Sequence, residues 1–272
     1  MSIGKLVIVI ITLLISLSII AYTIYIIVSP QEGIGGRPTI VANVTRSGEV
    51  FLPLPRKVTT MTVEEAILLR RSLREYKDEP LTIEQLSMIL WAAQGITETK
   101  WRFRAAPSAG ATYPLEVYVV IGEKGVKIDG EFLKAGVYKY NVLRHSLILV
   151  KEGDVRGELY RASLEQEWVR DAPIDLVICA IYERTTRVYG ERGYRYVYME
   201  VGHVGQNVYL MATALGLGTV VVGAFHDEWV AKIINAEPNE HPLYIIPVGV
   251  PVHPYRFSFE ELGKWYESMR SR

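Results

Sequence analysis

An unusual concentration of cations occurs in the segment RRSLREY, which places three arginines and a serine within five positions: Arg70, Arg71, Ser72 and Arg74. The segment follows TVEEAILL, where Thr62 and Glu65 match a capping box and predict a helix up to about Arg71. Cations at the C-terminal end of a helix are favoured by its dipole, which is one explanation of the cluster. The other explanation is a bound anion, most simply a phosphate, because guanidinium forks, a hydroxyl and backbone N–H groups together suit it.

A second stretch combines small residues with a kinked backbone just before an apolar run. It is RAAPSAGATYPLEVYVV at 104–120, and its central residues are Pro107, Ser108, Ala109 and Gly110. Small side chains leave the backbone uncovered, so a flat ring can approach closely and meet N–H donors. The alternative is an ordinary tight loop that leads into a strand.

Several common catalytic motifs are missing from the sequence. It has no G-x-x-x-x-G-K-[ST] phosphate loop and no G-x-S-x-G nucleophile motif, and GLGTVVVG at 216–223 neither matches G-x-G-x-x-G nor follows a strand. Glu200 and His203 form a single E-x-x-H pair, whereas a di-iron bundle needs two, and the one cysteine, Cys179, lies in an apolar run. We therefore expect no metal site and, if the protein is an enzyme, a bound organic cofactor that carries the chemistry.

The overall charge is balanced, with 30 basic and 30 acidic residues in a chain of 272. Nucleic-acid-binding surfaces normally show a basic excess, so we expect no nucleic-acid partner. A single cysteine also excludes an internal disulfide. The length suffices for one domain with a large core.

The N-terminal segment differs sharply from the rest in hydropathy. Residues 6–28 carry no charged side chain over 23 positions, and a helix of about 20 apolar residues crosses a bilayer. No small-residue cleavage pattern follows, so we predict an uncleaved, single-pass membrane anchor at 1–28. Lys5 on one side balances Arg37 and Arg46 on the other, so the positive-inside rule does not choose an orientation. A Gly- and Pro-rich linker or arm at 29–57 then leads to the domain proper at 58–272.

The remaining patterns predict a mixture of helices and strands. A second capping box at Thr82–Gln85 opens a helix that Gly95 ends, and a long helix is expected at 196–216. Strands are expected at 115–121, 136–141, 146–153, 174–182 and 243–250, and further helices at 155–168 and from Asp227. No regular alternation of strand and helix appears, so we predict an α+β fold. The long helix carries two stripes, one apolar (Val201, Val204, Val208, Met211, Leu215) and one mixed (His203, Asn207, Leu210, Ala214), and is expected to be covered on both sides, by its own domain and by a partner.

Taken together, these stretches resemble the nitroreductase superfamily of FMN enzymes, and most closely its SagB/ThcOx branch. The resemblance covers about Met61 to Arg256, with the matching motifs in the family's order: RRSLREY, 80–95, 104–120, 188–196, 200–225 and 247–251. It implies an α+β, nitroreductase-like fold with a central, mostly antiparallel sheet flanked by helices. It also implies a homodimer with two FMN sites at the interface.

The resemblance assigns roles to particular residues. Arg70, Arg71, Ser72 and Arg74 match the group that grips the phosphate, the ribityl chain and the ring edge, and Arg256 matches a late phosphate contact. The loop formed by Pro107, Ser108, Ala109 and Gly110 matches the one that reaches the flavin from the partner subunit. Gln166 stands where the family has an amide against the pyrimidine edge, and Val222, Gly223 and Ala224 match the backbone beside the ring. A cation near the reduced ring stabilises its negative charge, and Arg74 is the candidate for this catalytic contribution.

These expectations lead to an FMN-dependent oxidoreductase with ping-pong hydride transfer from NADH or NADPH, or another donor, to a small acceptor such as a quinone or a nitro compound. Two alternatives are a SagB-type azoline dehydrogenase of peptide modification and a membrane-tethered flavin-binding module without turnover. A reductive dehalogenase fits less well, because the substrate-lid motif of that branch is missing.

One departure bears on the substrate. Azoline oxidases of the branch show Lys-Tyr-Gly where this chain has Val188, Tyr189 and Gly190. Valine cannot hold a proton, and a tyrosine hydroxyl is a poor base near neutral pH without a cationic neighbour. Tyr189 is a candidate catalytic residue, or else merely a packed or surface aromatic. We expect no efficient azoline oxidation, and better activity on quinones or nitroaromatics.

Overall fold

The computed structural model describes residues 49–272. The predicted anchor at 1–28 and the linker up to residue 48 lie outside the described residues, so both stay predictions. None of the helices within 49–272 combines the length and the apolar character that a membrane crossing needs.

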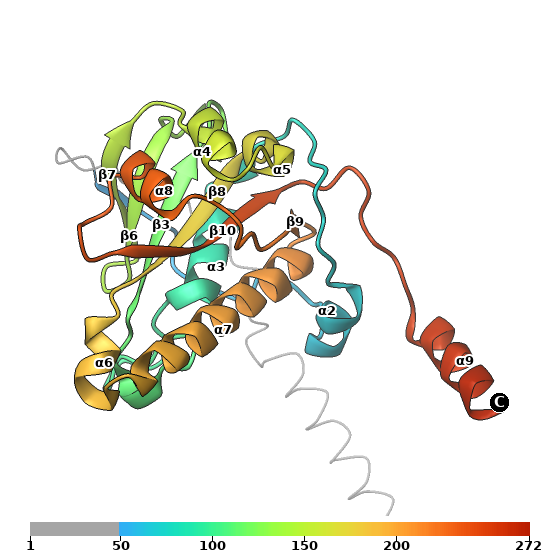
Figure 1. Cartoon of the computed structure of the whole chain (residues 1–272). Helices are drawn as coiled ribbons and strands as arrows, with labels where there is room; N and C mark the ends of the chain where they lie inside the picture. The colour runs from blue at the N-terminus through green and yellow to red at the C-terminus, as the bar shows by residue number, and fades with distance from the viewer. Residues whose placement is uncertain (1–48) are drawn as a thin grey trace, which may run out of the picture. The chain divides into compact units, whose positions relative to one another are not determined.

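A seven-stranded sheet forms the centre of the domain, in the order β1-β7-β6-β3-β8-β10-β9 (Figure 1). Its strands are β1 (Glu49–Phe51), β3 (Leu115–Ile121), β6 (Gly136–Asn141), β7 (Ser146–Glu152), β8 (Ile174–Ala180), β9 (Gly218–Thr219) and β10 (His241–Gly249). All neighbouring pairs are antiparallel. The predicted α+β class with a mostly antiparallel sheet is confirmed, and the expected arm before residue 58 supplies the edge strand β1.

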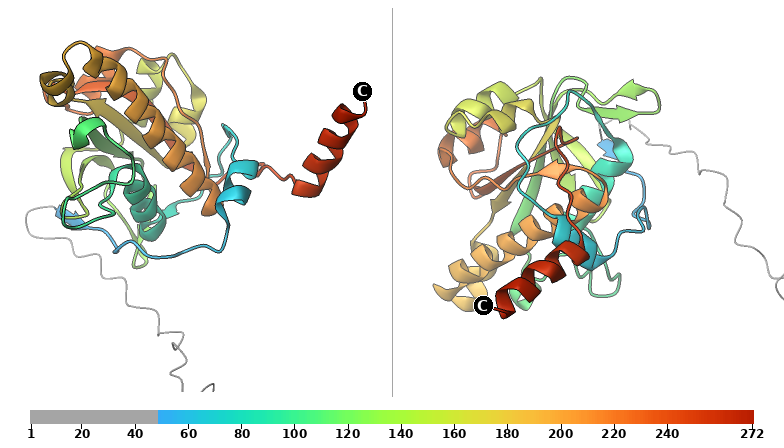
Figure 2. Two further views of the ribbon diagram at one scale, coloured as in Figure 1. Left: turned by 90° about the horizontal axis from the view of Figure 1, so that it is seen from below. Right: turned by 90° about the vertical axis from the view of Figure 1, so that its right-hand side faces the viewer.

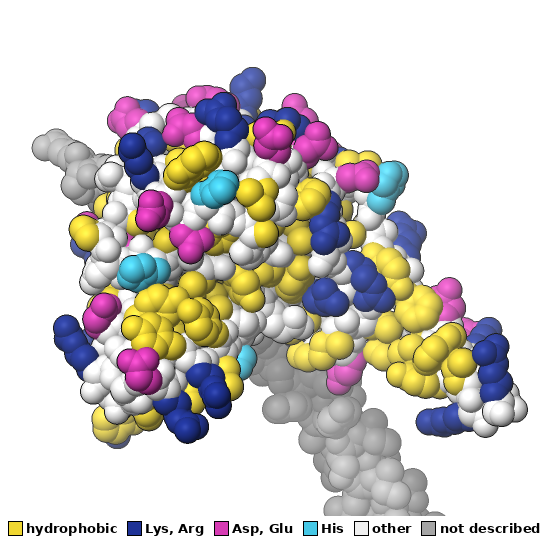
Figure 3. All heavy atoms as spheres, viewed as in Figure 1, with side chains coloured by type: hydrophobic (Ala, Val, Ile, Leu, Met, Phe, Trp, Pro, Cys, Tyr) yellow, Lys and Arg dark blue, Asp and Glu magenta, His cyan; other side chains and the backbone are white. Residues whose placement is uncertain are grey.

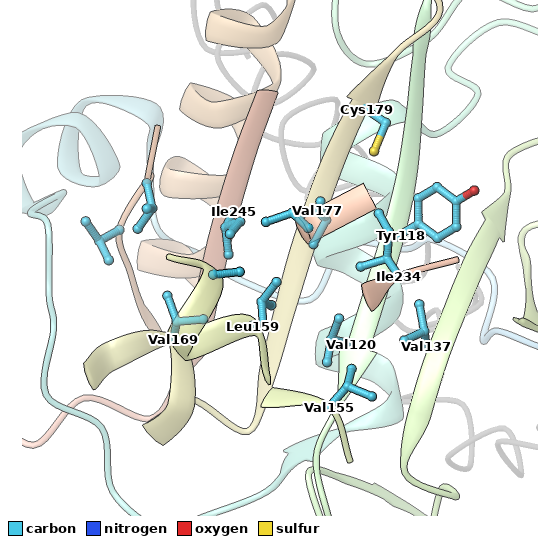
Figure 4. Packing of buried hydrophobic residues seen from close by; sticks show 14 residues of the cluster. Tyr118, Val120, Val137, Val155, Leu159, Val169, Val177, Cys179, Ile234 and Ile245 are labelled. Atoms are coloured by element: carbon cyan, nitrogen blue, oxygen red, sulfur yellow. The ribbon is translucent and has the colours of Figure 1, made fainter. Parts of the chain in front are cut away.

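The apolar runs of the sequence occupy the middle of this sheet. Every residue of β8 is buried, as its continuous hydrophobic sequence predicts for a strand covered on both faces. One face carries a cluster that includes Tyr118, Val177 and Ile245, and these side chains meet Leu159 and Val169 from neighbouring helices (Figure 4).

Helices cover both faces of the sheet (Figure 1). On the face of that cluster lie α4 (Arg156–Ala162), α5 (Glu167–Asp171) and α8 (Asp227–Ile233). On the opposite face α3 (Ile83–Gln94) packs against α7 (Arg192–Ala214). Beside them lie α2 (Val63–Leu69) and α6 (Glu183–Tyr189), and a small second sheet joins β2 (Leu81–Thr82), β4 (Val126–Ile128) and β5 (Glu131–Phe132).

Local sequence signals set several boundaries correctly. Thr62 and Thr82 both form complete capping boxes, with Glu65 and Gln85 respectively, and α3 ends at its C-cap Gly95. The helix expected at 155–168 is instead divided into α4 and α5, because Leu164 and Glu165 take left-handed φ angles of 58° and 57°. That conformation cannot continue a right-handed helix.

The last helix, α9 (Phe259–Arg270), was not predicted from the sequence. Its N-cap Ser258 forms a capping box with Glu261, yet none of its residues is buried. An extended segment joins it to β10, and Figure 2 draws it apart from the other described helices. Its aromatic residues Phe259, Trp265 and Tyr266 are all at least half exposed.

Candidate functional site

The segment that carries the three arginines is not helical. The helix α2 ends at Leu69, and from Arg70 onward the chain runs beside β9 and the C-terminal segment. Leu73 donates its N–H to the carbonyl of Thr219 at 3.0 Å, and Val252 donates to Glu75 at 3.0 Å. The prediction of a helix to about Arg71 was therefore two residues too long, and the arginines are held by long-range backbone pairing instead.

Arg71 and the other arginines of this segment are used differently. The Nη1 atom of Arg71 donates to the carbonyl oxygens of Leu68 at 3.1 Å and Arg70 at 2.6 Å, at the end of α2. Its guanidinium also lies 3.9 Å from the centre of the Tyr255 ring. The helix-end explanation thus describes Arg71, and the Tyr255 ring brings the following residue, Arg256, into the same neighbourhood.

Arg70 and Arg74 carry positive charge without a carboxylate to balance it. Among residues 49–272, neither forms an ion pair with an acidic side chain. Both lie instead over aromatic rings, Arg70 at 5.0 Å from the centre of Tyr209 and Arg74 at 5.2 Å from the centre of Trp168. A cation on an aromatic face keeps its hydrogen-bond donors available for an anion.

Ser72 is connected to the backbone segment at 220–224. Its Oγ lies 2.8 Å from the hydroxyl of Tyr209, which also accepts the N–H of Val221 at 3.0 Å. Val222 is buried and exchanges backbone hydrogen bonds with Ile245, whereas Gly223 and Ala224 are exposed. Tyr209 of α7 therefore joins two of the segments that the sequence predicted to surround one ligand.

Gln166 contacts the same backbone segment. Its Nε2 atom donates to the carbonyl oxygens of Ala224 at 2.9 Å and Ser163 at 2.8 Å. Because both amide protons are used within the protein, the Oε1 atom remains as the acceptor of this side chain. Gln166 follows the left-handed pair Leu164 and Glu165, so the break between α4 and α5 is what presents it.

A second group of predicted residues surrounds the loop Pro107–Gly110. Backbone φ angles of 59° at Gly110, 52° at Ala111 and 44° at Tyr113 show a strained, left-handed path before β3. A Cβ atom at Gly110 would lie 2.6 Å from the hydroxyl oxygen of Tyr189, so glycine is what allows this close approach. Pro107 and Gly110 are exposed, and Ser108 and Ala109 are half-buried.

Polar contacts fasten this loop to α6, which carries Tyr189. The hydroxyls of Thr112 and Thr185 lie 2.8 Å apart, and Nη1 of Arg184 donates to the carbonyl of Tyr113 at 3.0 Å. Tyr189 is 36% exposed and meets the ring of Tyr196 edge-on at 5.0 Å. Tyr189 is therefore placed against the loop, while the neighbouring Val188 is 62% exposed.

Glu200 lies behind the same loop, and its E-x-x-H spacing to His203 had suggested only a metal ligand. It is 2% exposed and belongs to the buried stripe of α7, between Val197 and Val204. Burial raises the pKa of its carboxyl to about 7, although Ser108, Gln94 and Arg104 each act to lower it. The signal in the sequence was a glutamate at helical spacing from buried valines. In the part of the chain that the structure describes, no group of three His, Cys, Asp or Glu side chains gathers as metal ligands would.

The two groups of site residues lie toward opposite ends of α7 (Figure 1). Glu200 faces the loop group, whereas Tyr209 contacts Ser72 and Arg70 of the arginine group. Nine residues of an α-helix separate these positions by about 14 Å, at a rise of ~1.5 Å per residue. The structure therefore brings Arg70, Arg71, Ser72, Arg74, Gln166, Val222–Ala224 and Arg256 to one end, and leaves Pro107–Gly110 and Tyr189 at the other.

Comparison with known proteins connects this arrangement to one family. The model of the nitroreductase family matches residues 67–250. A Methanocaldococcus jannaschii protein named for the nitroreductases is 50% identical over 201 residues, which cover 74% of this chain and 96% of that protein. The microcin B17-processing protein McbC of Escherichia coli is 34% identical over 138 residues, 49% of either chain.

Solved structures agree with the sequence relatives. A nitroreductase-like structure from Ralstonia eutropha has a TM-score of 0.66 at 28% identity and covers 79% of this chain and 94% of its own. A chain of the E. coli microcin synthetase complex McbBCD, solved with a truncated peptide, has a TM-score of 0.57 at 28% identity, covering 73% and 76%. A Desulfovibrio desulfuricans structure in complex with FMN has a TM-score of 0.51 at 22% identity, over 76% and 96%, and shows the shared fold alone.

Proposed function

The chain belongs to the nitroreductase family of oxidoreductases, and on that premise we propose that it is an FMN-dependent enzyme. In this proposal NADH or NADPH donates a hydride and a small acceptor, such as a quinone or a nitro compound, receives it in a ping-pong sequence. One observation supports the proposal most strongly. Arg70 and Arg74, which form no ion pair with an acidic side chain among the described residues, lie at the same end of α7 as the hydrogen bond between Gln166 and Ala224.

The donors at this end match the parts of FMN. Arg70 and Arg74, with Arg256 near them in the chain's path, provide cations for a phosphate that carries one to two negative charges. The hydroxyl of Ser72 suits the ribityl chain, and the free Oε1 acceptor of Gln166 suits a ring N–H. Exposed Gly223 and Ala224 leave backbone uncovered for a flat ring.

When bound, FMN supplies the hydride-accepting centre, which no side chain of this chain can provide. The protein's own part is to bind and orient. A fixed guanidinium at Arg74 stabilises negative charge that develops beside it, and the Trp168 ring restrains its position. Tyr209 fixes Ser72 and the 221–224 backbone relative to each other, so the two sides of the site move as one unit.

We propose that the active protein is a homodimer. The loop Pro107–Gly110 cannot reach the arginine group of its own chain along α7, so a second copy is needed to complete the site. Uncovered apolar surface supports this proposal. The mixed stripe of α7, with Asn207, Leu210 and Ala214, lines a groove with a volume of about 280 Å³.

The groove and α9 are complementary in chemistry. The groove is mainly apolar, with Met61, Trp91 and Met211 among its lining residues, and a neighbouring cavity of about 410 Å³ shares Trp91 and Met211. Hydrophobic side chains also cover much of α9 (Figure 3). A helix with an uncovered apolar face is stabilised when a partner covers it, so we propose that α9 packs on the second copy. Light scattering of the full-length protein in detergent should give a dimer, and removal of residues 257–272 should give monomers. A full-length protein that is monomeric and still binds FMN would contradict this proposal.

We also propose that residues 6–28 anchor the protein in a membrane as a single-pass segment, with the orientation left open. An uncharged run of 23 residues inserts through the hydrophobic effect, which salt does not screen. The protein should therefore stay with membranes during salt and carbonate washing. Release into the supernatant would exclude the anchor.

A SagB-type azoline dehydrogenase is the second candidate, because this chain is similar to McbC, which is named a microcin B17-processing protein. Against it stands Val188, which cannot hold a proton beside Tyr189 where the azoline oxidases carry lysine. We expect wild-type protein to reduce a quinone but to oxidise a thiazoline or oxazoline peptide poorly. Val188→Lys should improve only the azoline reaction. Robust azoline oxidation by the wild type would reverse the order of the two candidates.

The test of the main proposal uses the full-length protein in detergent. The protein should be yellow, acid should release FMN rather than FAD, and the flavin should bleach with NADH or NADPH and recolour with a quinone. Bound flavin that never bleaches with either nucleotide would support the flavin-binding module without turnover. Failure to bind FMN after reconstitution would exclude both proposals.

A further inference from the structure

Glu200 is a buried acid that the proposed FMN site does not use. It lies on α7 behind the loop Pro107–Gly110, is 2% exposed, and its Oε1 atom has no hydrogen-bond partner among the described residues. A buried carboxylate normally has a paired cation or several hydrogen bonds, because removing its charge from water is unfavourable. A carboxyl held this way is easier to keep protonated than a carboxyl at the surface.

The groups that face Glu200 come from α3 and from the loop. Gln94 of α3 is fully buried, and its Oε1 accepts from Nη1 of Arg104 at 3.0 Å. Its Nε2 atom has no hydrogen-bond partner in the part of the chain that is described, although Gln94 is among the groups that act on the Glu200 carboxyl. Arg104 itself is partly buried, and burial lowers the pKa of its guanidinium; Glu116 and Arg184 also act on it.

Ser108 connects this buried acid to the surface. It is half-buried, between Glu200 on the inner side and the exposed residues Pro107 and Gly110 on the outer side. Its Oγ atom accepts the N–H of Tyr113 at 2.9 Å, which fixes the hydroxyl and leaves its proton to be donated. A serine hydroxyl accepts and donates at once, so it can pass a proton from one side to the other.

We propose that Glu200 delivers a proton through Ser108 to the outer face of the loop Pro107–Gly110, where the acceptor substrate is reduced. This inference rests on the proposed function. Glu200 acts through Ser108 and does not contact the substrate. Its role is to hold the proton in position for transfer to Ser108. Such a group replaces the lysine that Val188 does not provide.

The reaction requires one proton of this kind. A quinone that receives a hydride becomes the hydroquinone monoanion, and one further proton gives the hydroquinone. In that step the hydroxyl proton of Ser108 moves to the anion, the proton of Glu200 moves to Ser108 Oγ, and Glu200 is left as a carboxylate near Arg104. Solvent then returns one proton to Glu200. No electrons move in the relay, and the nucleotide supplies both that the acceptor gains.

The electrostatics agree with this geometry. Burial is the largest influence on the Glu200 carboxyl and raises its pKa to about 7, against the opposing effects of Ser108, Gln94 and Arg104. A group with that pKa is present in both protonation states near neutral pH, which is the condition for efficient proton transfer.

The first experiment needs neither flavin nor turnover. Infrared difference spectra of the flavin-free, full-length protein in detergent are recorded against pH for wild type, Glu200→Gln and the control His203→Gln, an exposed position one turn along α7. The wild type and the control should show a protonated carboxyl band that titrates with a midpoint near pH 7, and Glu200→Gln should lack it. A midpoint below pH 5, or an unchanged band in Glu200→Gln, would overturn the proposal.

The second experiment measures quinone reduction by the FMN-loaded protein as a function of pH. In the wild type kcat should fall above about pH 7, whereas Glu200→Gln should lose this dependence and at least about tenfold in kcat, with KM for the nucleotide unchanged. Glu200→Asp should restore part of the rate. Ser108→Ala should keep the infrared band of Glu200 but lower kcat. If Glu200→Gln is unstable, this variant still distinguishes a lost proton transfer from a loss of folded protein. A wild-type profile in Glu200→Gln or Ser108→Ala would contradict the relay.

The two experiments also separate this inference from the function on which it rests. If the protein binds no FMN, the proposed function is wrong and the relay has no reaction to serve. The carboxyl band would in that case still show that Glu200 holds a proton. A protein that turns over with a pH-independent kcat would keep the function and exclude the relay.

Discussion

The arginine end and the loop end of α7 are built in contrasting ways. At the arginine end, charged side chains stand over aromatic rings, and backbone pairing of the 70–76 segment with Thr219 and Val252 holds them. At the loop end, a strained backbone rests on a buried acid, a buried amide and a tyrosine hydroxyl. The first end carries arginines that are always charged, and the second end has polar side chains buried inside the protein. This contrast underlies the two proposals, FMN binding at the arginine end and proton transfer at the loop end.

The largest expected effect concerns the buried acid of the loop end. The pKa of Glu200 rises from 4.5 to about 7 on folding, so its stabilising contribution is full below pH 4.5 and is lost as pH rises through 7. At ~1.4 kcal/mol per pH unit, the free energy of unfolding of wild type should fall by about 3 kcal/mol relative to Glu200→Gln over this window. Denaturant unfolding at a series of pH values measures the difference. An equal pH dependence in both proteins would show that Glu200 is ionised and paired.

The second effect concerns the arginine end. Arg74→Ala should weaken FMN binding by about 1.5–3 kcal/mol, the scale of hydrogen bonds to a charged group. Arg74→Lys should recover only part of the loss, because the planar fork is missing. Titration of the apo protein with FMN gives the affinities. If both variants bind as tightly as wild type, Arg74 is only a surface cation over Trp168.

The third effect tests the strained loop. Gly110→Ala should lower the free energy of unfolding by about 1–2 kcal/mol for its left-handed backbone, and further because the new methyl group meets the Tyr189 hydroxyl. Gly216→Ala is the control, since Gly216 follows the end of α7 with a φ of 72° and has open space around it. The excess loss at Gly110 should vanish in a Tyr189→Phe background. An equal loss at both glycines would mean that Tyr189 does not rest on the loop.

The smallest effect separates Arg71 from its neighbours. Because Arg71 donates to the last carbonyl groups of α2, Arg71→Ala should mainly lower stability, by about 1 kcal/mol, and should reduce FMN affinity less than Arg74→Ala does. Parallel unfolding and FMN titrations of the two variants make this comparison. A larger loss of FMN affinity in Arg71→Ala would assign the phosphate contact to Arg71 instead.

Much of the fold was decided by local sequence. The capping boxes at Thr62 and Thr82 act between residues close in the chain, and the continuous apolar run of β8 predicts a strand covered on both faces, so these elements could be predicted without tertiary information. The composition of RRSLREY and the small residues of Pro107–Gly110 likewise marked two unusual segments and led to the prediction of a phosphate-bearing cofactor. The order of these motifs along the chain also identified the family.

Tertiary structure decided how the segments combine. Nothing local shows that the chain after Arg70 leaves the helix, because pairing with Thr219, about 150 positions away, is what draws it out. The contact of Gln166 with Ala224 depends on a left-handed break between two helices, and the state of Glu200 depends on burial behind a loop from elsewhere in the chain. Sequence alone thus determined the family and the candidate residues, and long-range packing determined which groups meet, because burial and hydrogen bonding between distant residues exist only in the folded chain.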